Sequence, residues 1–83
     1  MATSVVAQMR IKKTRKEMEI TTLRIEAKGL CRAIVAGITP ELNTIEEMNT
    51  ISAAGSMDQL IAKQAEILFL QEEIWGLEKA LGQ

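Results

Sequence analysis

Residues 57–82 read MDQLIAKQAEILFLQEEIWGLEKALG, and their pattern predicts a long helix that packs against other helices. An apolar row recurs there at steps of three, four or seven residues, and Lys63 fills one of its slots. The members of this row are Leu60, Ile67, Leu70, Ile74, Leu77 and Leu81. Such spacing is typical of the seam of a coiled coil, in which the row faces a partner helix.

A second apolar row lies beside that seam. Ile61, Leu68 and Trp75 repeat every seven residues. With successive residues placed about 100° apart, the two rows together cover an arc of about 200°. Phe69 points away from this arc. Because a helix with one packed side needs a narrower apolar stripe, we expect a protein interface that includes both rows and Phe69.

Residues 4–36 are predicted to form a second long helix, with an apolar row at steps of three and four residues. The members of this row are Ile20, Leu23, Ala27, Leu30 and Ile34, and Lys13 and Lys16 interrupt its continuation toward the N-terminus. A thinner stripe of Ile11, Met18 and Ile25 lies nearly opposite. A helix with two apolar faces is expected to be flanked on both sides, so this stripe belongs to the predicted interface.

Two breaks are predicted between these helices. Gly37 is suited to the left-handed conformation that ends a helix, and Pro40 to the first position of the next. Ser56 and Gln59 have the spacing of a capping box, which predicts that the last helix begins at about residue 57. The chain is then a single helical domain, 1–83, with helices at about 4–36, 40–53 and 57–82, and Gly82 as the final stop.

The predicted fold is all-α: a long helical hairpin or three-helix unit with coiled-coil-like packing, held within an oligomer or larger assembly. A chain of 83 residues has little core of its own and usually needs a disulfide, a metal or a partner. A single cysteine excludes an internal disulfide, and the absence of histidine removes the commonest metal ligand. Oligomerisation or very regular helix packing remains as the source of stability for the fold.

Charge is distributed unevenly along the chain. Residues 1–36 have a net charge of +5 and residues 37–83 a net charge of −6, which gives the −1 of the whole chain. The basic run, residues 10–16, contributes Arg10, Lys12, Lys13, Arg15 and Lys16. In an antiparallel hairpin this run would lie near the acids of the last helix, Glu72, Glu73 and Glu78, and we favour that pairing.

Two other partners for the basic run stay open. Cations spread around a helix suit phosphate contacts without base reading, so nucleic acid is the second interpretation. Anionic lipid is the third and least favoured. No aromatic residue interleaves the run, and the chain as a whole is slightly acidic, which both argue against a dedicated nucleic-acid protein.

Enzyme chemistry has few candidate residues here. The chain has no histidine or tyrosine, a single aspartate and no Gly-rich phosphate loop. Cys31 lies next to the apolar row of its helix and is expected to be an inert, packed thiol. Gly76, beside Trp75, is expected to allow a close helix approach. We expect no enzymatic activity, no cofactor, no metal and no small-molecule substrate.

The expected function is therefore that of a structural, assembly or adaptor protein that self-associates or binds a larger protein. Its size and helical style are similar to those of small helical-hairpin subunits of phage particles and secretion needles, by architectural analogy alone. The alternative is a small nucleic-acid-associated regulator that uses the basic run. We see no secretory signal and no apolar run of about 20 residues, so we expect the cytoplasm of a cell or of an infected host.

Overall fold

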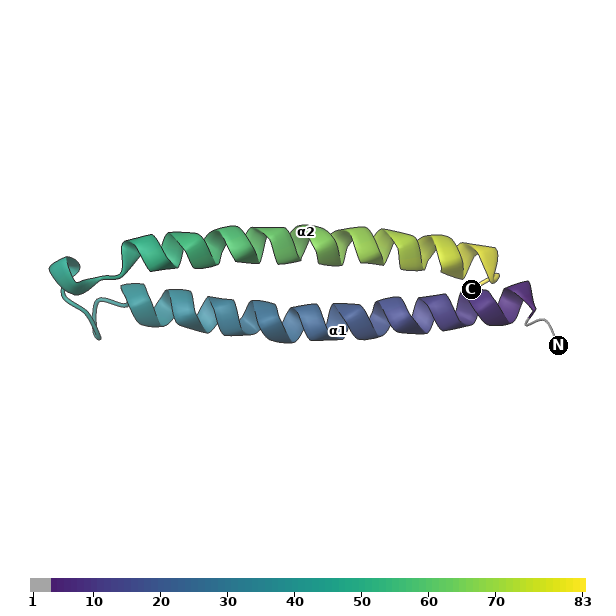
Figure 1. The fold of residues 1–83 in the computed structure, drawn as a ribbon, viewed down its shortest axis with the longest axis horizontal. Helices are drawn as coiled ribbons and strands as arrows, with labels where there is room; N and C mark the ends of the chain where they lie inside the picture. Colours follow the sequence, from purple (N-terminus) through teal and green to yellow (C-terminus); the bar gives the residue numbers. More distant parts are fainter. Residues whose placement is uncertain (1–3) are drawn as a thin grey trace.

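The protein is a long hairpin of two antiparallel helices, shown in Figure 1. This computed structural model describes residues 4–83. Helix α1 (Val5–Ile38) and helix α2 (Thr50–Ala80) run side by side, and a single 3₁₀ turn, η1 (Ile45–Glu47), lies in the connection. The hairpin measures 64 × 20 × 17 Å, with both chain ends at the same end of the long axis. The all-α helical hairpin predicted from the sequence is confirmed.

The first helix begins and ends close to its predicted limits, but not for the predicted reason at its end. Ser4 caps the start, because its Oγ accepts a hydrogen bond from the Ala7 amide at 3.1 Å. Gly37 does not adopt a left-handed conformation and lies inside α1, which continues to Ile38. The prediction that Gly37 ends the helix is wrong. Pro40 follows closely, and because a proline cannot continue a helix, it accounts for the stop.

The predicted short helix over 40–53, and with it the three-helix unit, is wrong. Residues 40–42 form a turn, and Asn49 caps α2 by accepting a hydrogen bond from the Ser52 amide at 3.2 Å. Helix α2 then runs without interruption through residues 53–56, so the predicted start at residue 57 is also wrong. A glycine inside a helix costs only about 1 kcal/mol relative to alanine, which is too little for Gly55 to interrupt a run that Asn49 has already started.

The other end of α2 agrees with the sequence. Gly82 has a φ of 76°, the only positive φ among the described residues. The amides of Leu81 and Gln83 donate to the carbonyls of Leu77 and Glu78. These bonds satisfy carbonyl groups that the last helical turn would otherwise leave free, so Gly82 is the C-terminal stop that the sequence predicted.

The core lies along the middle of the hairpin, where the two predicted seam rows meet. Ile20 and Leu23 of α1 pack with Leu70 and Ile74 of α2, and Ile67 packs against this cluster. Ile34 is buried separately, closer to the connection. No described side chain is fully buried. The seam is correctly predicted, but it forms a thin core for a molecule of this length.

Candidate protein-interaction surfaces

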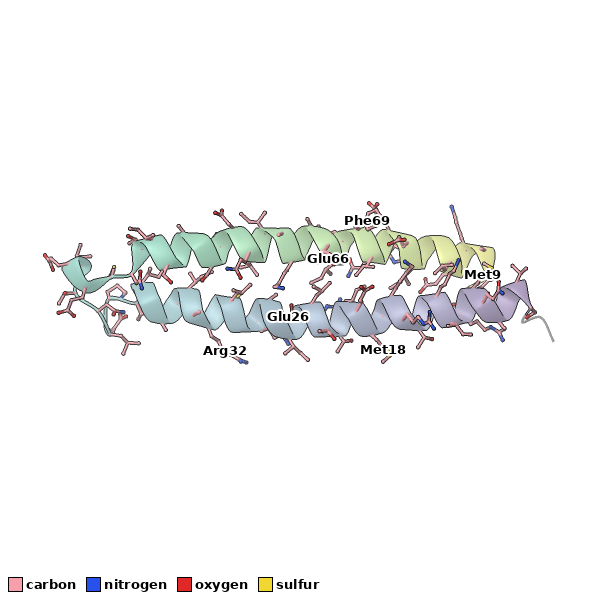
Figure 2. All side chains as sticks on the ribbon, viewed as in Figure 1. Met9, Met18, Glu26, Arg32, Glu66 and Phe69 are labelled. Atoms are coloured by element: carbon pink, nitrogen blue, oxygen red, sulfur yellow. The ribbon has the colours of Figure 1, made fainter. Side chains whose placement is uncertain are left out.

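The side of α2 that faces away from α1 is rich in exposed apolar side chains. Ile61, Leu68, Phe69 and Trp75 are each more than half exposed, at 57%, 54%, 62% and 62%. Figure 2 shows Phe69 pointing away from α1. The second row and Phe69, which the sequence analysis placed in an interface, are therefore available to another molecule.

Ile61, Leu68 and Trp75 belong to a regular pattern on α2 that the sequence analysis recognised only in part. A row of exposed residues follows α2 at alternating steps of three and four, nearly opposite the seam. We call it the outer stripe, and its members are Asp58, Ile61, Ala65, Leu68, Glu72, Trp75 and Lys79. The spacing was available in the sequence, but three charged members and an alanine hid the row. A pattern of large apolar residues includes only every second position of this row.

The remaining predicted interface residues of α2 are used inside the hairpin. Leu70 and Ile74 are buried against α1, at 6% and 7% exposure. Half-buried side chains continue the same seam on either side of them: Leu60, Ile67, Leu77 and Leu81. Since α1 covers this row, it is the internal core of the hairpin, and a partner would contact α2 mainly through the outer stripe.

Helix α1 has an exposed apolar edge of its own. Ile11, Met18 and Ile25, which we call the α1 stripe, are 47%, 65% and 67% exposed. Met18 points away from α2 in Figure 2, on the opposite edge of the hairpin from Phe69. The two long edges of the molecule thus both carry apolar side chains that the hairpin itself does not cover.

The connection between the helices exposes further apolar side chains. Leu42 and Ile45 are 72% and 76% exposed, and Ile51, in the first turn of α2, is 88% exposed. Leu42 and Ile45 lie within residues 40–53, which were predicted to form a short helix, and that helix does not form. Val35 and Leu42 line a shallow apolar hollow beside Cys31, whose thiol is exposed and free, so the expectation of a packed thiol is wrong.

The basic run meets the acidic end of α2, as the antiparallel pairing predicts. Lys16 Nζ lies 2.9 Å from Glu73 Oε2, and Lys13 Nζ lies 3.6 Å from Glu78 Oε1. Lys13 Nζ also donates a hydrogen bond to Gln83 Oε1 at 2.7 Å. Glu72 does not join these pairs and stays exposed on the outer stripe.

The other three cations of the run have a different environment. Arg10, Lys12 and Arg15 are exposed, and none of them forms an ion pair with another residue of the described chain. The run therefore divides into two lysines that belong to the helix–helix contact and three cations that face solvent at the open end of the hairpin.

Each ion pair found within residues 4–83 joins a lysine of a seam row to a glutamate of the opposite helix. Lys13 and Lys16 occupy seam slots of α1, and Lys63 occupies one of α2, where its Nζ lies 2.5 Å from Glu26 Oε2. A charged residue at a seam position costs stability but favours one register. These lysines therefore help to fix how the two helices align.

Three of the four helical glycines make no close approach to other parts of the chain, whereas Gly37 lies beside the backbone of Asn49. A Cβ added at Gly29, Gly55 or Gly76 would meet no heavy atom within 4 Å. The expectation that Gly76 permits close packing beside Trp75 is not met within the hairpin. Trp75 itself is exposed, so the space beside Gly76 is open to solvent.

Within residues 4–83, no three His, Cys, Asp or Glu side chains gather into a group that would hold a metal. Neither α1 nor α2 is long and apolar enough to cross a bilayer.

Comparisons of the chain with protein-family models, with curated proteins and with solved structures find no match.

Proposed function

We propose that this protein is a non-enzymatic assembly or adaptor protein that acts by helix-to-helix contact with another protein chain. The observation that carries the proposal is the exposure of apolar side chains on the side of α2 that faces away from α1, centred on Leu68 and Phe69. A helix that is apolar around most of its circumference is normally buried. In the hairpin only the seam side of α2 is covered.

The thin core supports the same proposal. Among residues 4–83, five hydrophobic side chains are buried, and four of them form one cluster near the middle of the hairpin. A domain of this size is marginally stable even with a well-filled core. Covering the outer stripe or the α1 stripe with a partner would add buried apolar area, at roughly 25 cal/mol per Å². We therefore expect the hairpin to be most stable in a complex.

The basic run supports the protein-binding role more than a role in nucleic-acid binding. Lys13 and Lys16 are already engaged with Glu78 and Glu73, so fewer cations are free for phosphates. A regulator that binds DNA or RNA through Arg10, Lys12 and Arg15 would show affinity that falls steeply with salt. We expect no retardation of DNA or RNA in a mobility-shift assay at low salt, and a salt-sensitive shift would favour that alternative.

The proposal includes a location in the cytoplasm of a cell or of an infected host, where a helical subunit of this kind would assemble. The proposed function involves no cofactor and no small-molecule substrate. The architectural analogy to small subunits of phage particles and secretion needles is consistent with an assembly role.

The test is the mass of the native particle. Size-exclusion chromatography with light scattering, on the purified chain and on the chain captured from its own cells, should give a mass above the 9.2 kDa of one chain. Circular dichroism on the same samples should show a helical protein. A helical, cooperatively unfolding monomer that carries no partner in either preparation would contradict the proposal.

A further inference from the structure

We infer that the chain that covers the outer stripe is a second copy of this protein, packed antiparallel so that Leu68 lies on a two-fold axis. This inference rests on the proposed function and names its partner. The outer stripe of each copy would face that of the other, and the two α2 helices would form the centre of a four-helix assembly. A two-fold contact of this kind uses the same patch on both copies.

The spacing of the outer stripe suits this arrangement. Its members alternate at steps of three and four residues, as in the seam of an antiparallel coiled coil. With Leu68 opposite its own copy, Ile61 of each chain lies opposite Trp75 of the other. The three largest exposed apolar side chains of the stripe are then covered together, and each is more than half exposed in the single hairpin.

The charges at the ends of the stripe specify the direction of the second copy. Asp58 lies toward the start of α2 and Lys79 in its last turn, both exposed and neither in an ion pair within the described chain. In the antiparallel arrangement Asp58 of each copy lies within one residue of the position opposite Lys79 of the other. A parallel arrangement would place like charges opposite each other at both ends.

Glu72 is the one charged residue within the apolar part of the stripe. In the antiparallel arrangement it lies within one residue of the position opposite Ala65 of the other copy, the smallest member of the stripe. A small neighbour leaves room for the stem of Glu72 to lie along the contact while its carboxylate reaches water.

The distribution of charge over the whole hairpin favours the same direction. Residues 33–62 contain four acids and no lysine or arginine, and three of those acids, Glu41, Glu46 and Glu47, lie in the connection. Arg10, Lys12 and Arg15 are exposed at the other end of the hairpin. Antiparallel copies bring the acidic end of one toward the basic end of the other, which would also steer their encounter. This complementarity is what singles out a second copy among the occupants of the stripe.

The first experiment measures the mass of the full-length chain and of two matched variants by size-exclusion chromatography with light scattering. We expect the unaltered chain to have twice the 9.2 kDa mass of one chain. Leu68→Glu should reduce the mass to that of one chain, because it places two carboxylates at the axis. Val35→Glu, a control at a 60% exposed aliphatic residue of α1, should leave the dimer intact. Circular dichroism should show that all three remain helical.

A charge-exchange experiment tests the antiparallel direction. Asp58→Lys alone, or Lys79→Asp alone, creates two like-charge contacts per dimer and should raise the dissociation constant about tenfold. The double variant D58K/K79D restores opposite charges at both ends and should return the dissociation constant to within about threefold of the original. Failure of the double variant to recover, in a helical protein, would overturn the antiparallel register.

A cysteine cross-link tests the axis directly. With Cys31→Ser as background, Leu68→Cys should give a disulfide-linked dimer on mild oxidation, because the two copies of this position meet at the axis. Val35→Cys in the same background should remain mostly uncross-linked. Equal cross-linking of the two variants would overturn the inference.

The outcomes separate this inference from the proposed function. An oligomer that Leu68→Glu leaves intact and Met18→Glu dissociates would overturn the α2-to-α2 contact but retain a protein that assembles through an apolar edge. A monomer that binds a different protein, and loses it on Leu68→Glu, would likewise overturn only the second copy as partner. A stable helical monomer with no partner would overturn both.

Discussion

Lys16 Nζ lies 2.9 Å from Glu73 Oε2, across the contact between α1 and α2. The two residues are 57 positions apart in the chain. Lys16 occupies the seam position one step before Ile20, which is buried in the core. The seam is thus apolar in its middle and ionic toward the open end of the hairpin. Because the ammonium has its partner at only one register, this pair opposes sliding of α1 along α2.

Reversal of the charge at Lys16 tests that role. Lys16→Glu places a carboxylate beside Glu73 and should lower the free energy of unfolding by about 1 to 2 kcal/mol, since it removes a partly exposed ion pair and adds a repulsion. The side chains of Lys16 and Glu73 are 24% and 35% exposed, so added salt should reduce the loss. Urea unfolding followed by circular dichroism measures both effects.

The exchanged pair K16E/E73K serves as the control for that prediction. It should recover most of the lost stability, to within about 0.5 kcal/mol of the original chain. Equal destabilisation by the double and single variants would mean that Lys16 acts through the packing of its aliphatic stem, and not through its charge.

Leu70 should be far more important for folding than an exposed residue of the same helix. It is 6% exposed and belongs to the four-residue core cluster, so Leu70→Ala should cost about 2 to 3 kcal/mol. Ile51 is 88% exposed, and Ile51→Ala should change stability by no more than about 0.5 kcal/mol. Both are compared by urea unfolding at one protein concentration, because self-association would make stability depend on concentration. Similar costs at the two positions would contradict the placement of the core.

The start of α2 gives a prediction that separates the structure from the sequence-based expectation. Asn49 Oδ1 accepts a hydrogen bond from the Ser52 amide, so Asn49→Ala should cost about 1 kcal/mol. Ser56, which the capping-box pattern identified as the cap, lies inside the helix. Ser56→Ala should therefore be neutral or slightly stabilising. The reverse order of these effects in thermal unfolding would restore a helix that begins after Ser56.

The parts of the fold that the sequence predicted are those that depend on long, repeated patterns. The heptad row of Leu60, Ile67 and Ile74 and the matching row of Ile20 and Leu23 identified the seam, because many residues must agree before such a row forms. The antiparallel direction was expected of two long helices in a hairpin, and it predicted that the basic run would lie near the acids of the last helix. Lys13 and Lys16 confirm that reasoning through their pairs with Glu78 and Glu73.

The parts of the fold that the sequence did not predict depend on competition between short local signals. Asn49 and Ser56 both have the chemistry of an N-cap, and only the packing of the whole helix against α1 decides between them. Gly37 has the residue type of a helix stop but not the conformation. The outer stripe was recognised through Ile61, Leu68 and Trp75, whereas Asp58 and Lys79 are charged and so fall outside any apolar pattern.

Continuity of α2 through residues 53–56 is best tested at Gly55. A Cβ at this position would meet no heavy atom within 4 Å, so Gly55→Ala should raise the free energy of unfolding by about 0.5 to 1 kcal/mol, through the lower entropy of the unfolded chain. Gly82, with a φ of 76°, is the matched control, and Gly82→Ala should lower stability by up to about 1 kcal/mol. A chain that bends at Gly55 would need the freedom of glycine there. In that case Gly55→Ala would be the destabilising variant.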